Sequence, residues 1–498
     1  MSIVGVGTRS LLLTQSLVGM RAQLGDLQRQ LATGKRSDDY AGLGIDRGLT
    51  VGLRSHLSAI GGYGDTITTV GVRLELAQTV LSRVSAIGRE TKAVAAEMTT
   101  ADGRAAAQTS ATSALGEILG LLNTRAGDRY LFSGMATDRP AVASLEQILE
   151  GDGARAGFKQ VVSERLQADI GANGLGRLAV SALSPTAIAV SEEAPPTVFG
   201  FKLGAISSSL TGATVAGPTG MPAQVSLDLG AVNPNAGETV RFLFNLPDGS
   251  TETITLTATT STTPAAGEFA IGIDSMATLA SLQASLGIEI GSRARTALSA
   301  ASALAAADDF FNIDDANPPR RVAGPPFDAA TGFATGTAAD TVMWYTGEAG
   351  SQAARSIASA RVDQSISVQY GMRANEEGIR WQLQNVAALA ALSMSSTDPD
   401  THQRAAALTT RLRAALDVPA GTQSVEAIQA ELAGAQTAIG AAKLRHQQTE
   451  ATLANLLQEI EGVTNEEVAA KILALQTSLN ASLETTARLF QTSILNYL

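Results

Sequence analysis

Apolar residues near the start of the chain recur at a helical spacing. They are separated alternately by four and three positions, which places them on one stripe of a helix. This stripe consists of Leu13, Leu17, Met20, Leu24, Leu27 and Leu31. After an expected loop, a second run alternates in the same way and consists of Ile60, Tyr63, Ile67, Val70, Leu74, Ala77, Leu81 and Val84. The pattern predicts two helices, each with one apolar face.

The C-terminal end shows the more regular pattern. A strict alternation of three and four is held by Val425, Ile428, Leu432, Ala435, Ile439, Ala442, His446, Thr449, Leu453, Leu456, Ile460 and Val463. Residues 464–467, Thr-Asn-Glu-Glu, then form a capping box that starts another helix. The apolar face of that helix carries Val468, Ile472, Leu475, Leu479, Leu483, Phe490, Ile494 and Tyr497. Heptads sustained over this length indicate a coiled coil.

The middle of the chain, residues 180–345, has a different character. Its Gly-, Pro- and Thr-rich stretches break helices. Residues 239–244 and 253–257 flank the turn Pro-Asp-Gly, which predicts a β-hairpin. We expect a helix over residues 276–306 and a second hairpin near residues 355–370.

These patterns predict a mainly α protein with a β-containing insert. Both chain ends would form a long antiparallel helical coiled-coil bundle, and the centre would be an outward-facing α+β or β domain. The expected segments are an N-terminal helical segment at residues 1–135, a central insert at residues 136–350 and a C-terminal helical segment at residues 351–498.

Composition narrows the possible partners and compartments. Lys and Arg total 36 against 47 Asp and Glu, a net charge of −11, and no cluster of basic residues indicates nucleic-acid binding. There is no cysteine, which excludes disulfides and thiolate metal sites. No apolar run approaches the roughly 18 residues of a transmembrane helix, and the first residues lack the features of a Sec signal. We therefore expect neither nucleic-acid binding nor membrane insertion.

The residues offer no catalytic or cofactor chemistry. The three histidines, His56, His402 and His446, fall on separate predicted helices without a metal-ligand spacing. Residues 33–37 lack the first glycine of a phosphate-binding loop, because that position is Arg29. Residues 171–176 have glycines in the wrong order for a dinucleotide fingerprint and predict a turn. We expect a protein that is not an enzyme, with no cofactor, no metal and no catalytic residue.

Two terminal stretches resemble the bacterial flagellin superfamily. Residues 27–44 contain a helix end, a Thr-Gly turn and a segment with two aspartates followed by Ala-Gly-Leu, similar to the N-terminal signature of that family. The distance between the turn and Asp38 is shorter than is typical. Residues 460–469 and the closing helix resemble the flagellin C-terminal region. The resemblance covers roughly residues 1–135 and 350–498.

Two further motifs resemble the hook-associated junction group of the superfamily more than filament subunits. They are Tyr-Leu-Phe-Ser-Gly at residues 130–134 and the ending Leu-Asn-Tyr-Leu at residues 495–498. The resemblance implies a secreted structural subunit of the extracellular flagellum at the hook–filament junction. It also implies type III export, self-assembly in a ring or helical array, and contacts with a hook-side hook-associated protein, flagellin and an export chaperone.

The apolar faces of both terminal helices are the candidate assembly seams. A helix with an unpartnered apolar stripe requires partner helices, and identical neighbours in a helical array would supply them. The candidate residues are Leu13, Leu17, Met20, Leu24, Leu27, Leu31, Ile472, Leu475, Leu479, Leu483, Phe490 and Tyr497. The alternatives are a filament flagellin and, from another class, a coiled-coil adhesin or surface-binding module whose β insert holds the ligand.

Overall fold

The computed structural model describes residues 3–314, 317–348, 350–415 and 421–495, and the side chains of residues 3–10 and 489–495 are not described. The chain divides into two compact units. The first comprises Met1–Val70, Ala360–Val368 and Thr437–Leu498, and the second comprises Gly71–Ser359 and Gln369–Gln436. Two long helices, α2 (Arg47–Ala96) and α10 (Val425–Glu461), contribute residues to both units.

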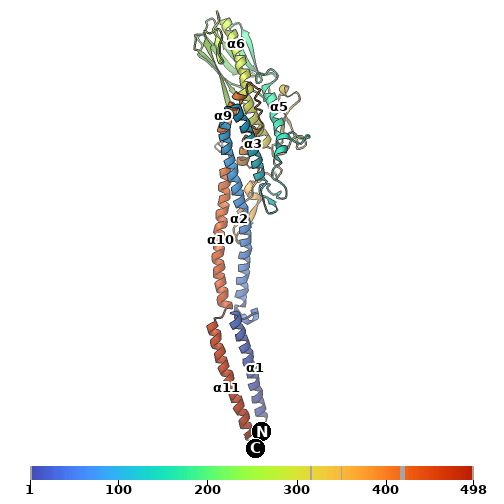
Figure 1. The fold of residues 1–498 in the computed structure, drawn as a ribbon, viewed down its shortest axis with the longest axis vertical. Coiled ribbons are helices and arrows are strands. Elements are labelled where there is room, and N and C mark those ends of the chain that lie inside the picture. The colour runs from blue at the N-terminus through green and yellow to red at the C-terminus, as the bar shows by residue number, and fades with distance from the viewer. Residues whose placement is uncertain (1–2, 315–316, 349, 416–420, 496–498) are drawn as a thin grey trace. The chain divides into compact units, whose positions relative to one another are not determined.

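The first unit is built from helices of the two chain ends. Its other helices are α1 (Ile3–Thr33), the short 3-10 helix η1 (Tyr40–Asp46) and α11 (Asn465–Leu495). Helices α1 and α11 lie side by side and antiparallel (Figure 1). The first part of α2 packs against the last part of α10 through a small core formed by Leu53, Ile60 and Leu453.

The buried row of α10 departs from the predicted heptads at one position in this unit. Leu456 is exposed, whereas the neighbouring Leu457 packs against the small core. A straight helix drifts by about 20° per heptad relative to a strict 3.5-residue repeat, so the partner-facing row moves to the adjacent position. The prediction for Leu456 was therefore wrong, while Val425, Ile428, Leu432 and Leu453 are buried as expected.

His446 lies on the same seam and is buried. Its Nε2 donates a hydrogen bond to the carbonyl of Val362 at 2.7 Å, and its ring stacks on Tyr63 with centroids 5.6 Å apart. Val362 lies between the short strands β13 (Ser359–Arg361) and β14 (Ser367–Gln369), which form the second predicted hairpin. The histidine therefore ties a coiled-coil helix to this hairpin.

The second unit contains the remaining helices and most strands. The longer helices are α3 (Ala101–Leu122), α5 (Phe158–Ile170), α6 (Ser275–Arg293), α7 (Ser299–Phe311), α8 (Glu377–Ala391) and α9 (Thr401–Ala415). The shorter elements are α4 (Leu145–Glu150), the π-helical turn η2 (Ala294–Leu298) and the 3-10 turns η3 (Phe327–Ala329) and η4 (Ala354–Ile357). The predicted helix over residues 276–306 is thus confirmed, with η2 joining α6 to α7.

Two four-stranded sheets form the β region of this unit. One has the order β3 (Leu178–Ser184), β4 (Ala187–Glu192), β7 (Gln224–Asp228), β6 (Thr214–Thr219). The other has the order β10 (Glu268–Ala270), β9 (Thr251–Thr259), β8 (Thr239–Asn245), β5 (Lys202–Ser208). The predicted hairpin is the antiparallel pair β8–β9, in which Phe242 lies opposite Ile254. Three small hairpins complete the strands: β1 (Arg125–Ala126) with β2 (Arg129–Tyr130), β11 (Arg320–Val322) with β12 (Phe333–Thr335), and β13 with β14.

Both sheets and helix α6 share one hydrophobic core (Figure 1). Alternate residues of β7, β8 and β9 point into it, as the period of two in a half-buried sheet requires. Phe242 and Phe244 on β8 and Leu282 and Leu286 on α6 are among its fully buried members. We call β3–β10 with α6 the double-sheet region.

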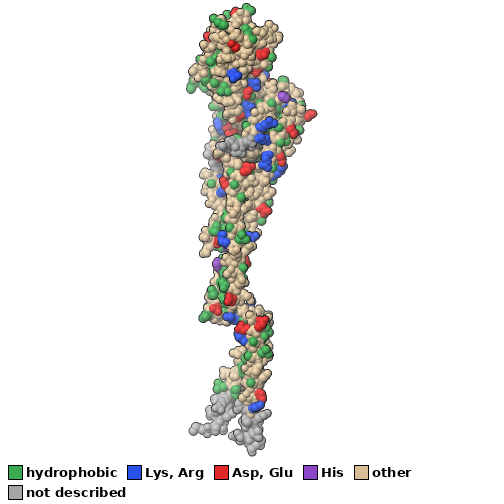
Figure 2. Space-filling model, turned by 90° about the vertical axis from the view of Figure 1, so that its left-hand side faces the viewer, with side chains coloured by type: hydrophobic (Ala, Val, Ile, Leu, Met, Phe, Trp, Pro, Cys, Tyr) green, Lys and Arg blue, Asp and Glu red, His purple; other side chains and the backbone are tan. Residues whose placement is uncertain are grey.

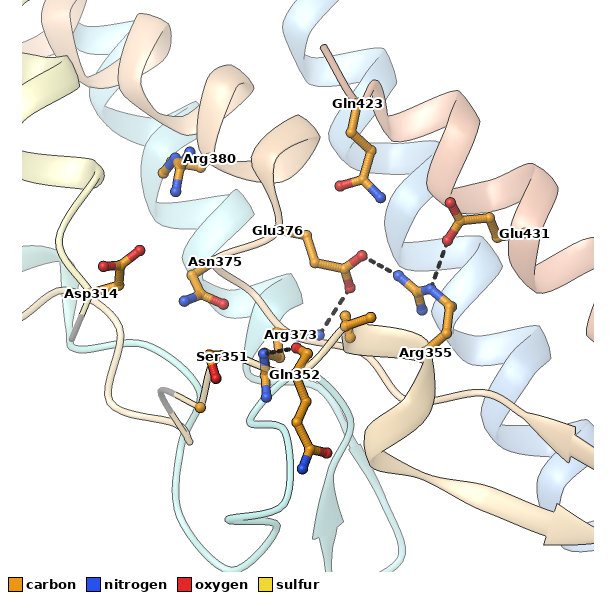
Figure 3. Close-up of a pocket in the computed structure, with 13 residues that line it drawn as sticks. Asp314, Ser351, Gln352, Arg355, Arg373, Asn375, Glu376, Arg380, Gln423 and Glu431 are labelled. Carbon is orange, nitrogen blue, oxygen red and sulfur yellow. Dashed lines mark hydrogen bonds and ion pairs between the residues drawn. The ribbon is translucent and has the colours of Figure 1, made fainter. Parts of the chain in front are cut away.

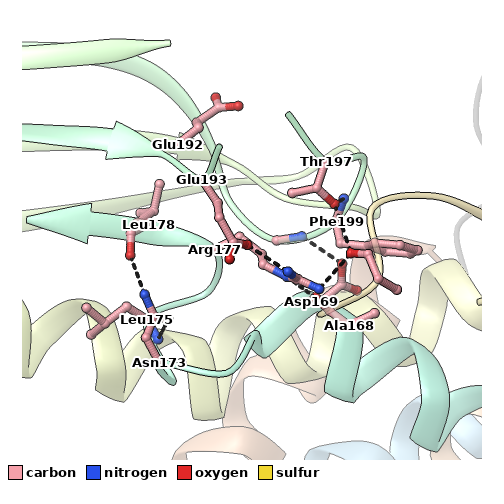
Figure 4. Close-up of polar contacts among 12 residues, drawn as sticks. Ala168, Asp169, Asn173, Leu175, Arg177, Leu178, Glu192, Glu193, Thr197 and Phe199 are labelled. Carbon is pink, nitrogen blue, oxygen red and sulfur yellow. Dashed lines mark hydrogen bonds and ion pairs between the residues drawn. The ribbon is translucent and has the colours of Figure 1, made fainter. Parts of the chain in front are cut away.

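Arg177 stabilises the connection between α5 and the double-sheet region (Figure 4). Its φ of 66° is in the left-handed region, which costs a side-chain-bearing residue about 1 kcal/mol. The buried guanidinium donates to the carbonyls of Ala168 at 2.6 Å and Ala330 at 2.8 Å and pairs with Glu193 at 2.7 Å. These bonds hold the strained residue in place.

The structure is 54% helical, with long helices at both chain ends and a central region that contains the β-sheets. The predicted class, a helical bundle from the two ends plus a β-containing domain, is therefore confirmed. Among the described residues, no helix combines the length and apolar character needed to cross a lipid bilayer.

Candidate assembly surface

The helices α1 and α11 form the pair that carries the candidate seam residues, and we call them the terminal pair. Within this pair the seam residues are only half-buried. This is true of Leu13, Leu17, Met20, Leu24, Leu27, Ile472, Leu475 and Leu479, whereas Leu31 and Leu483 are exposed. The side chain of Phe490 and the whole of Tyr497 lie outside the described residues. One partner helix therefore covers each stripe incompletely.

Further apolar side chains of the terminal pair face away from the seam. Leu11 is 71% exposed, Val18 62% and Leu473 65%. In the space-filling view, apolar side chains of these helices reach the surface among polar ones (Figure 2). The only side chain of α11 that is fully buried among those described is Val468, which is 1% exposed. These exposed apolar side chains make the surface of the terminal pair the candidate for contacts with further helices.

A groove between the two helices adds to this surface. It has a volume of about 520 Å³, and Leu27, Ala474 and Leu475 provide its apolar lining. Its polar lining consists of Gln23, Asp26, Gln30, Lys471 and Ser478. The ion pairs near the groove, Arg29–Asp26 and Lys471–Glu467, each lie within one helix.

The segment that follows α1 and the segment that precedes α11 are hydrogen-bonded to each other. Gly34, with a φ of 67°, ends α1, and its carbonyl accepts a hydrogen bond from the amide of Val463 at 3.1 Å. The amide of Arg36 in turn donates to the carbonyl of Glu461 at 2.7 Å. The Thr-Gly turn at one chain end and the Gly-Val segment at the other therefore form one paired junction.

The loop after this junction is ordered by its aspartates. Asp39 caps η1 by accepting a hydrogen bond from the amide of Gly42 at 2.9 Å, and this bond is the main reason why the pKa of Asp39 is lowered. Gly42 packs so closely on Ser37 that a Cβ would come within 2.2 Å of its Oγ. At the start of α11, the hydroxyl of Thr464 accepts from the amide of Glu467 at 3.2 Å, which is one half of the predicted capping box. The carboxylate of Glu467 accepts from Lys471 at 2.6 Å.

The Tyr-Leu-Phe-Ser-Gly motif at residues 130–134 is folded into the second unit. Phe132 and Ser133 are completely buried, and the carbonyl of Phe132 accepts a hydrogen bond from the amide of Ala374 at 2.8 Å. The amide of Gly134 donates to the carbonyl of Met372 at 3.2 Å. The motif thus runs beside residues 372–374, and Tyr130 remains half-buried at the edge of a cavity of about 230 Å³.

A larger cavity of about 600 Å³ lies next to residues 373–376 (Figure 3). Arg355 bridges Glu376 and Glu431, and Arg373 pairs with Glu348 at 2.8 Å. Burial raises the pKa of Glu376, and the facing Arg355 partly offsets this rise. The two arginines are therefore committed to ion pairs that hold the loops and helices of this unit together.

The polar groups of the described chain offer little for metal chemistry. No group of three or more His, Asp or Glu side chains is arranged to hold a metal ion within the described ranges. The double aspartate at residues 38–39 caps and braces a loop: Asp38 pairs with Arg29 at 3.2 Å, and Asp39 accepts from a backbone amide. The glycines at residues 171–176 form a turn, in which Gly171, Gly174 and Gly176 have positive φ angles.

Comparison with known proteins identifies the N-terminal part of the chain. No curated protein matches the chain. Residues 8–137 match the family described as the bacterial flagellin N-terminal helical region. This range includes α1 from residue 8 onwards, the Asp39 loop and the Tyr-Leu-Phe-Ser-Gly motif. The match supports the bacterial flagellin family for this chain, and with it a structural subunit of the flagellum that self-assembles and serves motility.

Proposed function

We propose that the chain joins hook to filament as a hook-associated junction protein, similar to hook-associated protein 3. The observation that carries the assembly role is the terminal pair, whose stripes stay half-buried when only α1 and α11 meet. Further helices from neighbouring subunits would bury Leu13, Leu475 and their neighbours. Burial of a leucine side chain contributes about 1.5–3 kcal/mol, so a row of them drives assembly.

The resemblance of residues 130–134 and 495–498 to the junction group supports this position within the flagellum. The neighbours on this proposal are a hook-side hook-associated protein, flagellin and further copies of this chain in a ring or helical array. Export would follow the flagellar type III route, with an uncleaved N-terminal signal and an export chaperone. The proposed segments are residues 1–135 and 351–498 for the tube wall and residues 136–350 for the insert. We assign no enzymatic activity to the chain.

Electron microscopy of cells that lack the protein tests the proposal. We expect hooks without filaments and flagellin released into the medium, both restored by the wild-type gene. Normal filaments in the deletion strain would contradict the junction role.

The second candidate is filament flagellin, which the shared family match favours equally. A junction subunit presents different surfaces to its two neighbours, so its stacking stops, whereas a filament subunit continues to add to its own kind. Purified protein seeded with sheared filament fragments should therefore not extend them. Micrometre-long filaments made only of this chain would identify it as flagellin instead.

A further inference from the structure

A cavity of about 570 Å³ in the second unit is separate from the terminal pair. It lies where four helices and the β8–β9 turn meet, and its volume is within the range of small-molecule sites. Its lining combines an indole, two side-chain amides, carboxylates and guanidinium groups. The residues that decide its chemistry are Trp381, Gln384, Asn385, Asp308, Phe333 and Arg411.

Gln384 provides the first indication of a ligand. It is 6% exposed and lines the cavity, yet its amide has no hydrogen-bond partner anywhere in the described chain. A side-chain amide offers two donors and one acceptor, and those of Gln384 open onto the cavity instead of onto other described groups. Asn385 beside it is 2% exposed and uses its Nδ2 to donate to the carbonyl of Trp381 at 2.7 Å.

The charged groups of the cavity indicate which ligands it favours. Arg411 pairs with Asp248 at 2.9 Å, and Arg165 and Arg320 both pair with Asp309. Every arginine of the lining is thus already neutralised by a carboxylate, so an anionic ligand gains little. By contrast, Asp308 is exposed and has no ion pair among the described residues. Its carboxylate accepts hydrogen bonds and favours a ligand that carries hydroxyl donors.

The aromatic residues supply an apolar platform. Arg320 covers the ring of Phe333, with the guanidinium carbon 4.2 Å from the centroid, so that ring is occupied. Trp381 is half-buried, lines the cavity and donates its Nε1–H to the carbonyl of Ala415. This bond fixes the indole in place as a flat apolar surface with a satisfied polar tip.

We propose that this cavity binds a neutral saccharide. A pyranose ring has an apolar face of C–H groups, which matches Trp381, and a rim of hydroxyls that both donate and accept. Those hydroxyls would satisfy the amide of Gln384 and the carboxylate of Asp308 without needing a free cation. The cavity shares no lining residue with the terminal pair, so this proposal assigns it recognition and not assembly.

Intrinsic fluorescence of the full-length protein measures the binding directly. The chain has two tryptophans, and Trp344 is completely buried, so a ligand in this cavity changes the emission of Trp381. The neutral probes are the methyl glycosides of glucose, mannose and galactose, together with N-acetylglucosamine. We expect at least one to give a saturable change with a dissociation constant of about 1 mM or lower. Glucuronate, inorganic phosphate and spermidine are the charged comparison probes.

Two variants locate the site. Gln384→Ala should weaken the saccharide at least ~10-fold in titration calorimetry, because it removes the free amide. If Gln384→Ala fails to fold, Gln384→Glu is measured in its place. It keeps the shape of the side chain and should also weaken binding. Gln382→Ala is the matched control. Gln382 lies on the same helix, is similarly buried and has an unpaired Oε1, but it packs against Gly88 outside the cavity. It should bind as the wild type does.

Three outcomes would overturn the assignment. The first is the absence of a saturable response to every neutral probe, which would mean that water satisfies Gln384. The second is tighter binding of glucuronate, phosphate or spermidine than of any neutral saccharide. The third is equal loss of binding in Gln382→Ala and Gln384→Ala, which would place the ligand elsewhere.

Discussion

The terminal pair and the double-sheet region bury their apolar residues to different degrees. In the double-sheet region, Phe242, Phe244 and Leu282 are essentially inaccessible, and both sheets and α6 contribute to one closed core. In the terminal pair, Leu27 and Leu475 are half-buried although they lie on apolar stripes with helical spacing. The first region is complete within one chain, whereas the second has apolar surface left for partners. Regular apolar periodicity therefore predicts that a helix face will be buried. It does not show whether the partner that buries it comes from the same chain or from another.

The sharpest test of this difference is Leu475→Asp, for which we expect complete loss of incorporation into the flagellum. A carboxylate buried without a partner costs several kcal/mol once neighbouring helices enclose the position. In the isolated chain, where Leu475 is half-buried, the cost is smaller and the double-sheet region should unfold as in the wild type. Complementation of a deletion strain, scored by swimming and electron microscopy, measures the effect.

Gln476→Asp is the matched control for this substitution. It places the same charge on the next residue of α11, which is exposed. It should restore swimming. If Leu475→Asp restores it equally well, the assembly role of this stripe is wrong.

The converse substitution is Phe242→Ala in the double-sheet region. Removal of a fully buried phenylalanine should lower the free energy of unfolding by about 3–5 kcal/mol. Urea denaturation followed by circular dichroism measures this change. Arg241→Ala, at an exposed neighbouring position of β8, should stay within about 0.5 kcal/mol of the wild type. A comparably small effect of Phe242→Ala would mean that the core is looser than its burial indicates.

Hydrogen exchange compares the two regions without a substitution. In the isolated chain, amides of α1 and α11 should exchange at least ~10-fold faster than those of β8 and β9, because the terminal pair buries little apolar surface. After assembly the difference should narrow. Strong protection of both terminal helices at low protein concentration would show that the pair is stable without partners.

The periodic parts of this fold were predictable from the sequence. The stripe from Leu13 to Leu31, the hairpin β8–β9 and the helix cap at Thr464 all rest on contacts between residues close in sequence or on one repeating period. Such signals are local, so they are visible before the chain folds.

The remaining features depend on residues far apart in the sequence. Helix α5 and the sheet that contains β3 were not predicted individually, and Arg177, which links them, is recognisable only from its contacts with Ala168 and Ala330. The saccharide cavity likewise collects Asp308, Trp381 and Arg411 from three separate helices. Gln384 was indistinguishable from a solvent-exposed helical glutamine, because only the fold shows that it is buried and unpaired.

The smallest expected change in stability concerns a hydrogen bond between α2 and α10 in the second unit. The hydroxyl of Ser85 on α2 donates to Glu426 on α10 at 2.6 Å, and this bond is the main reason why the pKa of Glu426 is lowered from its ordinary value of 4.5. A lowered pKa means that the ionised form is favoured in the folded state. The resulting stability is present above pH 4.5 and is lost as the pH falls through the folded-state pKa.

Glu426→Gln should therefore destabilise the second unit at pH 7 by less than about 1 kcal/mol, because solvent screens this exposed carboxylate. The difference from the wild type should shrink progressively as the pH is lowered below 4.5, since protonation then weakens the same bond in the wild type. Urea denaturation at a series of pH values measures this trend. Glu75→Gln, which alters an exposed carboxylate on α2, is the control and should show no such pH dependence. A Glu426→Gln difference that stays constant or grows towards acid would show that Glu426 stabilises the unit by packing and not by its charge.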